Sequence, residues 1–146
     1  MNALKWWMRI VGTFYVVLFV VGSIVKLPVE MTLQQAGITF QPDNFVHMFL
    51  ADTWVMFTLE VAVIGVMLWV ASRNPLQNRI LVYTLFGIEL VRGIVDDIYM
   101  LARGYEPGFY IGWIVIHSVI ILTGWWALQR AKSAQPEQPT SQPATA

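Results

Sequence analysis

The amino-acid sequence predicts an all-α integral membrane protein, folded as an antiparallel four-helix bundle with a disordered C-terminal tail. Composition is the first indication: hydrophobic residues make up 57% of the 146 residues and charged residues only 12%, against roughly a quarter charged in a soluble domain. The second is that four apolar segments each approach the roughly 20 residues that a helix needs to cross hydrocarbon. At this length we expect one domain, residues 1–130, followed by the tail 131–146.

The predicted spanning helices cover residues 6–25, 50–71, 80–101 and 109–128. Lys5 and Arg9 give the first segment some likeness to a secretory signal, but its apolar run is longer than a signal core. We therefore expect this segment to be retained as a helix. The last three segments are joined by short polar links, which make neighbouring helices antiparallel.

Residues 26–49 form the one sizeable loop of the predicted bundle. Asp43 and Asn44 are available there to cap the second helix, and His47 is expected in the same water-exposed loop. After Lys132 the chain is rich in proline and poor in apolar residues. Such a tail cannot bury a core, so we expect it to be disordered and dispensable for the fold.

The positions of Lys and Arg predict the orientation, because cytoplasmic loops carry an excess of positive residues. The six on one side are Lys5, Arg9, Arg73, Arg79, Arg130 and Lys132, and the two on the other are Lys26 and Arg103. This excess predicts that both termini are cytoplasmic and that the loop 26–49 lies outside.

Composition and motifs also exclude several classes of function. Nine Lys and Arg balance nine Asp and Glu, so nucleic acid is not an expected partner. The absence of Cys removes thiolate chemistry and Cys-bound metals. The sequence has no glycine-rich phosphate loop, no G-x-S-x-G motif and no His pair at metal-binding spacing. We therefore predict no catalytic residue, no metal site and no cofactor.

Ionisable residues inside the predicted spans are the main functional signal, because each costs at least about 2.5 kcal/mol at the centre of a spanning helix. We predict a polar binding cluster in the outer half of the bundle, made of Glu60, Glu89, Arg92, Asp96 and His117. Asp52 and Asp97 are secondary members, expected nearer the outer water. With five acids and one permanent cation, either some carboxylates are protonated, or a bound cation compensates them, or water enters.

Helical spacing predicts how this cluster is arranged. Glu89, Arg92 and Asp96 are three and four residues apart, which places them on one stripe of an α-helix. Arg92 would then be the electrostatic centre, with Glu60 or His117 as its partner across the bundle. Asp97 points about 100° away from Asp96. The alternative is structural: the charges form an internal ion pair that fixes helix register, and His117 is a hydrogen-bonded packing residue.

The run ELVRGIVDDIY at residues 89–99 resembles the third-helix signature of the BphX-like family of small bacterial membrane proteins. The segment LADTW at 50–54, the RNP turn at 73–75 and RGY at 103–105 are similar as well. The resemblance covers nearly all of residues 1–130. It implies a four-helix protein of the bacterial inner membrane without an established activity, named after a gene beside aromatic-hydrocarbon degradation genes, and it supplies no catalytic residues.

Three functions remain open from the sequence. The first is binding or transport of a proton, a cation or a small amphiphile, which the excess of acids favours. The second is a non-catalytic accessory or scaffold subunit that contacts another membrane protein or a second copy of itself, which the small size favours. The third is a membrane enzyme in which Glu60 or Glu89 serves as general acid or base on a lipid-soluble substrate. In each case the lipid bilayer is an expected partner.

Overall fold

The computed structural model describes residues 2–25, 27–35 and 37–134, and the regular structure within them is entirely helical. The elements are α1 (Asn2–Val25), α2 (Leu27–Gln35), α3 (Phe45–Ala71), α4 (Arg79–Ile88), the π-helical segment η1 (Glu89–Val95), α5 (Asp96–Ala102) and α6 (Pro107–Ser133). The prediction of an all-α fold is confirmed.

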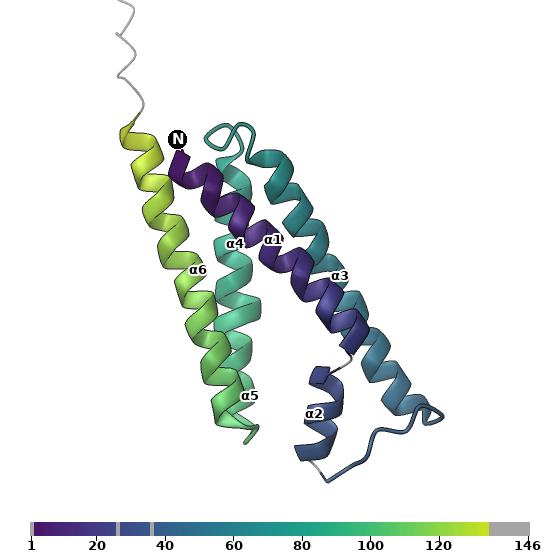
Figure 1. The fold of residues 1–146 in the computed structure, drawn as a ribbon. Coiled ribbons are helices and arrows are strands. Elements are labelled where there is room, and N and C mark those ends of the chain that lie inside the picture. The colour runs from purple at the N-terminus through teal and green to yellow at the C-terminus, as the bar shows by residue number, and fades with distance from the viewer. Residues whose placement is uncertain (1, 26, 36, 135–146) are drawn as a thin grey trace, which may run out of the picture.

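Figure 1 shows α1, α3 and α6 beside a fourth helical rod, which consists of α4, η1 and α5 in unbroken succession. The central element is α1, which packs along α3 and also contacts α6, while α6 packs against the rod. The chain reverses direction from each of these long elements to the next. The start of α1 and the end of α6 therefore lie at the same end as the α3–α4 connection.

We call this end the basic end, because six cationic residues gather there. They are Lys5 and Arg9 of α1, Arg73 after α3, Arg79 at the start of α4, and Arg130 and Lys132 near the end of α6. The opposite end, where α2 lies and α5 ends, is the α2 end.

Local sequence explains where the helices begin and end. The side chain of Asn44 accepts hydrogen bonds from the backbone N–H groups of Val46 and His47, so Asn44 caps α3 as expected. Glu106 does the same for α6, with Pro107 in the first helical position. Gly104, with φ of 83°, follows α5 in the left-handed conformation that glycine adopts without steric cost.

Several boundaries differ from the prediction. The loop 26–49 contains α2, and α3 begins at Phe45 rather than at residue 50. His47 is consequently a buried helical residue, whose Nδ1 accepts a hydrogen bond from the Gln41 N–H. The expectation that His47 lies in a water-exposed loop was wrong, because the Asn44 cap starts the helix upstream of it. Finally, α6 continues to Ser133, and the predicted tail from residue 135 onward lies outside the described residues.

Three helices among the described residues are long and apolar enough to cross a membrane, judged by length and composition. They comprise Asn2–Ser23, Phe45–Ala71 and Pro107–Ser133. The rod is not among them, because η1 divides it into short segments and it carries Glu89, Arg92, Asp96 and Asp97.

The apolar core lies toward the basic end. It is made of Leu4, Trp7, Met8, Val11 and Tyr15 from α1, Leu68 and Ala71 from α3, Val82 and Leu85 from α4, and Ile120, Ala127, Leu128 and Ala131 from α6. The indole N–H of Trp7 donates to Thr123 Oγ1 at 3.2 Å, and the ring stacks edge-on against Phe86.

Close packing of α1 on α3 depends on two facing glycines. A Cβ placed on Gly12 would lie 2.6 Å from the carbonyl oxygen of Gly65, and the reverse substitution gives the same distance. Gly87 and Gly112 have no neighbour within 4 Å. Close helix packing in the described residues therefore depends on the glycines that face another helix.

Candidate functional site

Among the described residues, the most buried pairing of ionisable side chains connects the rod to α6 through His117. Its Nδ1 lies 2.7 Å from Oε2 of Glu89, and its Nε2 lies 3.6 Å from Oδ2 of Asp97. The side chains are 19% exposed for His117, 4% for Glu89 and 10% for Asp97. We call these three residues the imidazole cluster.

The absence of a side chain on Gly93 makes room for the imidazole ring. A Cβ on Gly93 would lie 2.6 Å from Cγ and Nδ1 of His117, so any larger residue would displace the ring. On the α6 side, the ring of Trp113 lies 5.8 Å from that of His117 between centroids. The imidazole is thus held between Gly93 and its own helix.

The π-helical turn of η1 explains how two carboxylates eight positions apart reach one ring. In an α-helix, a step of four residues overshoots one turn by about 40°, so Glu89 and Asp97 would diverge by about 80°. A π turn is wider and takes more residues per turn, which brings the four-residue steps back toward one line. Glu89, Gly93 and Asp97 are all buried on the side facing α6.

This arrangement corrects the predicted stripe. Glu89 faces α6, whereas Arg92 and Asp96 are exposed, because the stripe was derived from α-helical spacing that η1 does not follow. Asp97, expected to be secondary, belongs to the buried cluster instead. The sequence signal that could have identified Asp97 is that Glu89 and Asp97 lie four residues before and four residues after Gly93. The helix that packs against them, α6, contains one histidine.

Arg92 forms a separate ion pair. Its Nη1 donates to Oε2 of Glu60 on α3 at 2.8 Å, which is one of the expected contacts across the bundle. The guanidinium also lies over the ring of Phe57, 4.4 Å from its centroid. However, the side chains of Arg92 and Glu60 are 50% and 63% exposed. We expected Arg92 to be the electrostatic centre of the cluster, but it lies outside the buried part.

The remaining predicted residues, Asp52 and Asp96, are both exposed. Neither forms an ion pair within the part of the chain that the structure describes. The predicted cluster thus divides into the imidazole cluster, the exposed Arg92–Glu60 pair and two isolated carboxylates.

The imidazole cluster has an unequal number of donors and acceptors. A neutral imidazole has one N–H, which can donate from Nδ1 to an ionised Glu89. Nε2 would then carry no proton and would face Oδ2 of Asp97, a buried atom with no hydrogen-bond partner among the described residues. One additional proton, on Nε2 or on Asp97, turns this contact between two acceptors into a donor–acceptor contact. In the described segments no three His, Asp or Glu side chains are placed to hold a metal ion.

Comparison with known proteins gives a family and no further relative. Residues 1–133 match the model of the BphX-like family. Neither the search of curated proteins nor the search of solved structures returned a match. The match includes every element of the fold and every residue of the site described above, and the chain belongs to the BphX-like family.

Proposed function

We propose that this protein is a multi-pass membrane protein that binds and releases a proton at the imidazole cluster. Three of its helices have the length and apolarity of membrane spans. The rod is also roughly 35 Å long at about 1.5 Å per residue, against about 30 Å of hydrocarbon. Its charged residues Glu89 and Asp97 face α6, and Arg92 is paired with Glu60.

The observation that carries the proposal is the pair of carboxylates on the two nitrogens of one imidazole. With both carboxylates ionised, each of them faces an N–H group only when His117 is protonated at both nitrogens. Loss of that proton leaves Nε2 and Asp97 as facing acceptors. Groups coupled in this way have titration steps that belong to the whole cluster rather than to one residue.

Access favours the α2 end, which the distribution of Lys and Arg predicts to be outside. Asp97 lies in the first turn of α5, close to where the rod ends at Ala102. Glu89 is deeper by about two helical turns. A proton from the outer water would therefore reach Asp97 first.

Infrared difference spectroscopy after a pH step tests the proposal on the purified protein. In the wild type, the imidazole and carboxyl bands of the cluster should change together over one pH range. His117→Gln should abolish this joint change, because His117 is the residue that contacts both carboxylates, whereas Asp97→Asn and Glu89→Gln should each move the pH range over which the remaining pair changes. Asp96→Asn is the matched control, since Asp96 is the exposed neighbour of Asp97, and it should leave the joint change intact.

Two outcomes would contradict proton binding at this cluster. One is a joint change whose pH range is the same in the wild type and in all three cluster variants. The other is a His117 signal whose titration is the same in the wild type and in Glu89→Gln. His47, the other of the two histidines, supplies the reference signal in every sample.

Membrane orientation is tested separately. Because the chain contains no Cys, single cysteines at Asp43, Gly104 and Gln77 can be probed with an impermeant thiol reagent on intact cells. Labelling of the first two but not of the third is expected for cytoplasmic termini. Labelling at Gln77 alone would reverse the orientation, and no labelling difference would argue against a spanning topology.

A second candidate function, an accessory subunit that contacts another membrane protein or a second copy, is favoured by one observation. The Arg92–Glu60 pair is exposed on the side of the molecule, where hydrocarbon would make it costly and a protein partner would cover it. Cysteine cross-linking from Val63, one turn from Glu60 and exposed, tests this candidate. If a protein partner or a second copy covers this side, Val63→Cys should give a cross-linked species. Leu122→Cys, at an exposed position on α6, should give none.

A further inference from the structure

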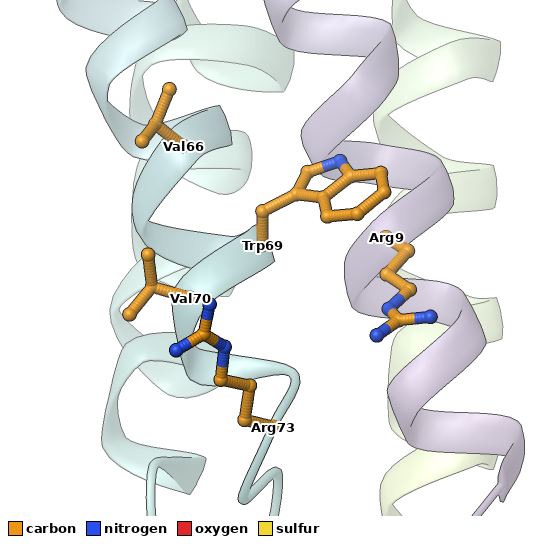
Figure 2. A pocket seen from close by; sticks show the side chains of 5 residues that line it. All are labelled: Arg9, Val66, Trp69, Val70 and Arg73. Atoms are coloured by element: carbon orange, nitrogen blue, oxygen red, sulfur yellow. The ribbon is translucent and has the colours of Figure 1, made fainter.

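We propose that a groove between α1 and α3 at the basic end binds the phosphate group of an anionic phospholipid. The groove has a volume of about 260 Å³ and is lined by Arg9, Val66, Trp69, Val70 and Arg73. Figure 2 shows Arg9 on α1 and Arg73 beside Val70 at the end of α3, with both guanidinium groups on the same side of the Trp69 indole. The inference rests on the proposed membrane insertion, and it is independent of the imidazole cluster.

Arg9 is held in position by three neighbours. Its Nε donates to Oγ of Ser72 at 3.2 Å. Its guanidinium carbon lies 5.3 Å from the centroid of the Trp69 ring and 5.6 Å from that of Trp6. The indole of Trp69 is in turn fixed by donation to Thr13 Oγ1 at 3.0 Å. These contacts leave the two terminal nitrogens of Arg9 available as donors.

The positive charge of the groove is not neutralised by the protein. Neither Arg9 nor Arg73 forms an ion pair with a carboxylate in the described part of the chain. A guanidinium offers a planar pair of N–H donors that matches a phosphate. Two such groups facing one groove therefore favour an anion with several acceptor oxygens.

The walls of the groove favour a lipid over a free phosphate. Val66, Trp69 and Val70 are exposed apolar residues of α3, and they precede Arg73, which lies just beyond the end of the helix at Ala71. An apolar surface thus extends from the cationic end toward the middle of α3. This sequence of surfaces matches a phospholipid, whose phosphate lies at the interface and whose acyl chains extend into the hydrocarbon.

Lipid titration of the full-length protein in a neutral detergent tests the site, with binding followed by native mass spectrometry. Phosphatidylglycerol, phosphatidylcholine and inorganic phosphate are compared as probes. The variant is Arg9→Gln/Arg73→Gln, and the control is Arg79→Gln/Arg130→Gln, which removes the same charge from the same end but outside the groove. We expect phosphatidylglycerol to bind more tightly than the other two probes. The groove variant should lose at least about 30-fold in affinity, because each guanidinium is expected to donate charge-assisted hydrogen bonds to the phosphate. The control should lose under about threefold, because its arginines do not line the groove.

Three results would overturn the proposal. Equal losses in the groove variant and the control would indicate a diffuse charge effect without a site. Unchanged binding in the groove variant would exclude these arginines. Inorganic phosphate that binds as tightly as phosphatidylglycerol would identify a free anion, not a lipid, as the ligand.

Two further variants distinguish loss of lipid binding at this site from a loss of folding and from failure of the proposed proton site. If the groove variant does not fold, Arg9→Lys/Arg73→Lys keeps both charges and should still lose several-fold, because an ammonium lacks the planar fork. Wild-type binding by that variant would contradict the guanidinium geometry. His117→Gln should bind phosphatidylglycerol like the wild type, so failure of the proton site leaves this result unaffected. Carbonate extraction of each variant from membranes reports insertion independently.

Discussion

The two halves of the molecule are built on different principles. Toward the basic end, the core is apolar and the helices approach closely at small residues, with Trp7, Phe86 and Gly124 packed together. Toward the α2 end, the rod and α6 are joined by the imidazole cluster, and the rod adopts a π-helical turn. The core of the first half is held by apolar packing and by the neutral hydrogen bond from Trp7 to Thr123, whereas the contacts of the imidazole cluster also depend on protonation.

This difference indicates where the molecule can change state. Apolar packing has one arrangement at every pH, because none of its groups titrates. A buried imidazole between two carboxylates has at least two protonation states, and both ionised carboxylates face an N–H group only when the imidazole is protonated at both nitrogens. We therefore expect the apolar half to determine the stability of the fold and the polar half to respond to its surroundings. Thermal unfolding of variants in detergent can test this division.

The largest loss of stability is expected from Gly12→Leu in the apolar half. A side chain there meets the backbone oxygen of Gly65 at 2.6 Å, so α1 and α3 must separate, at a cost of about 3 kcal/mol in the free energy of unfolding. Gly112→Leu is the control, since no atom lies within 4 Å of its added Cβ. Equal effects at the two positions would show that the α1–α3 contact does not support the fold.

In the polar half, His117→Leu should cost less, about 2 kcal/mol, because it leaves the buried carboxylate of Glu89 without its partner. The double variant His117→Leu/Glu89→Leu should regain part of this loss. A coupling energy of about 1 kcal/mol or more in the double-mutant cycle is expected for residues in direct contact. Additive effects would mean that the two residues do not interact.

Gly93→Ala and Gly87→Ala should change stability in opposite directions. Alanine at Gly93 meets the His117 ring and should lower the free energy of unfolding by about 1 kcal/mol. Gly87 has open space around it, so alanine there should raise stability by up to about 1 kcal/mol through better helix propensity. The same sign at both positions would remove the argument that Gly93 accommodates the imidazole.

The smallest effect is expected for the Arg92–Glu60 pair. Both side chains are at least half exposed, and exposed ion pairs contribute about 0–1 kcal/mol in a solvated environment. Arg92→Gln should therefore change the melting temperature in detergent only slightly. A loss as large as that of His117→Leu would return Arg92 to the centre of the polar network.

Much of the architecture followed from residues whose roles are local. Asn44 was recognised as a cap because its side chain satisfies the N–H groups at the start of a helix. The apolar runs predicted the long helices α1, α3 and α6, since apolar length along one segment is visible without knowing its neighbours. By contrast, two features were not predicted: the short helix α2 and the start of α3 at Phe45. The prediction searched for apolar runs of spanning length, and neither feature is such a run by itself.

The sequence predicted several residues of the candidate site but not their grouping. Glu60, Glu89, Arg92 and His117 were identified because an ionisable residue in an apolar segment is unusual whatever it contacts. Which of them are buried together depended on α6 packing against the rod and on the π-helical turn at Glu89–Val95. Spacing rules for an α-helix placed Arg92 with Glu89, whereas the structure places Asp97 there instead.

The sequence by itself determined the family, the all-helical class and the set of candidate residues, because these depend on residue type and order along the chain. Only the tertiary structure decided that His117 lies between Glu89 and Asp97, that Arg92 pairs with Glu60 at the surface, and that Arg9 and Arg73 share a groove. The physical reason is that side-chain direction in the rod is set by helical pitch. That pitch changes where η1 interrupts the α-helix. Contacts between helices depend in addition on which of their faces pack together.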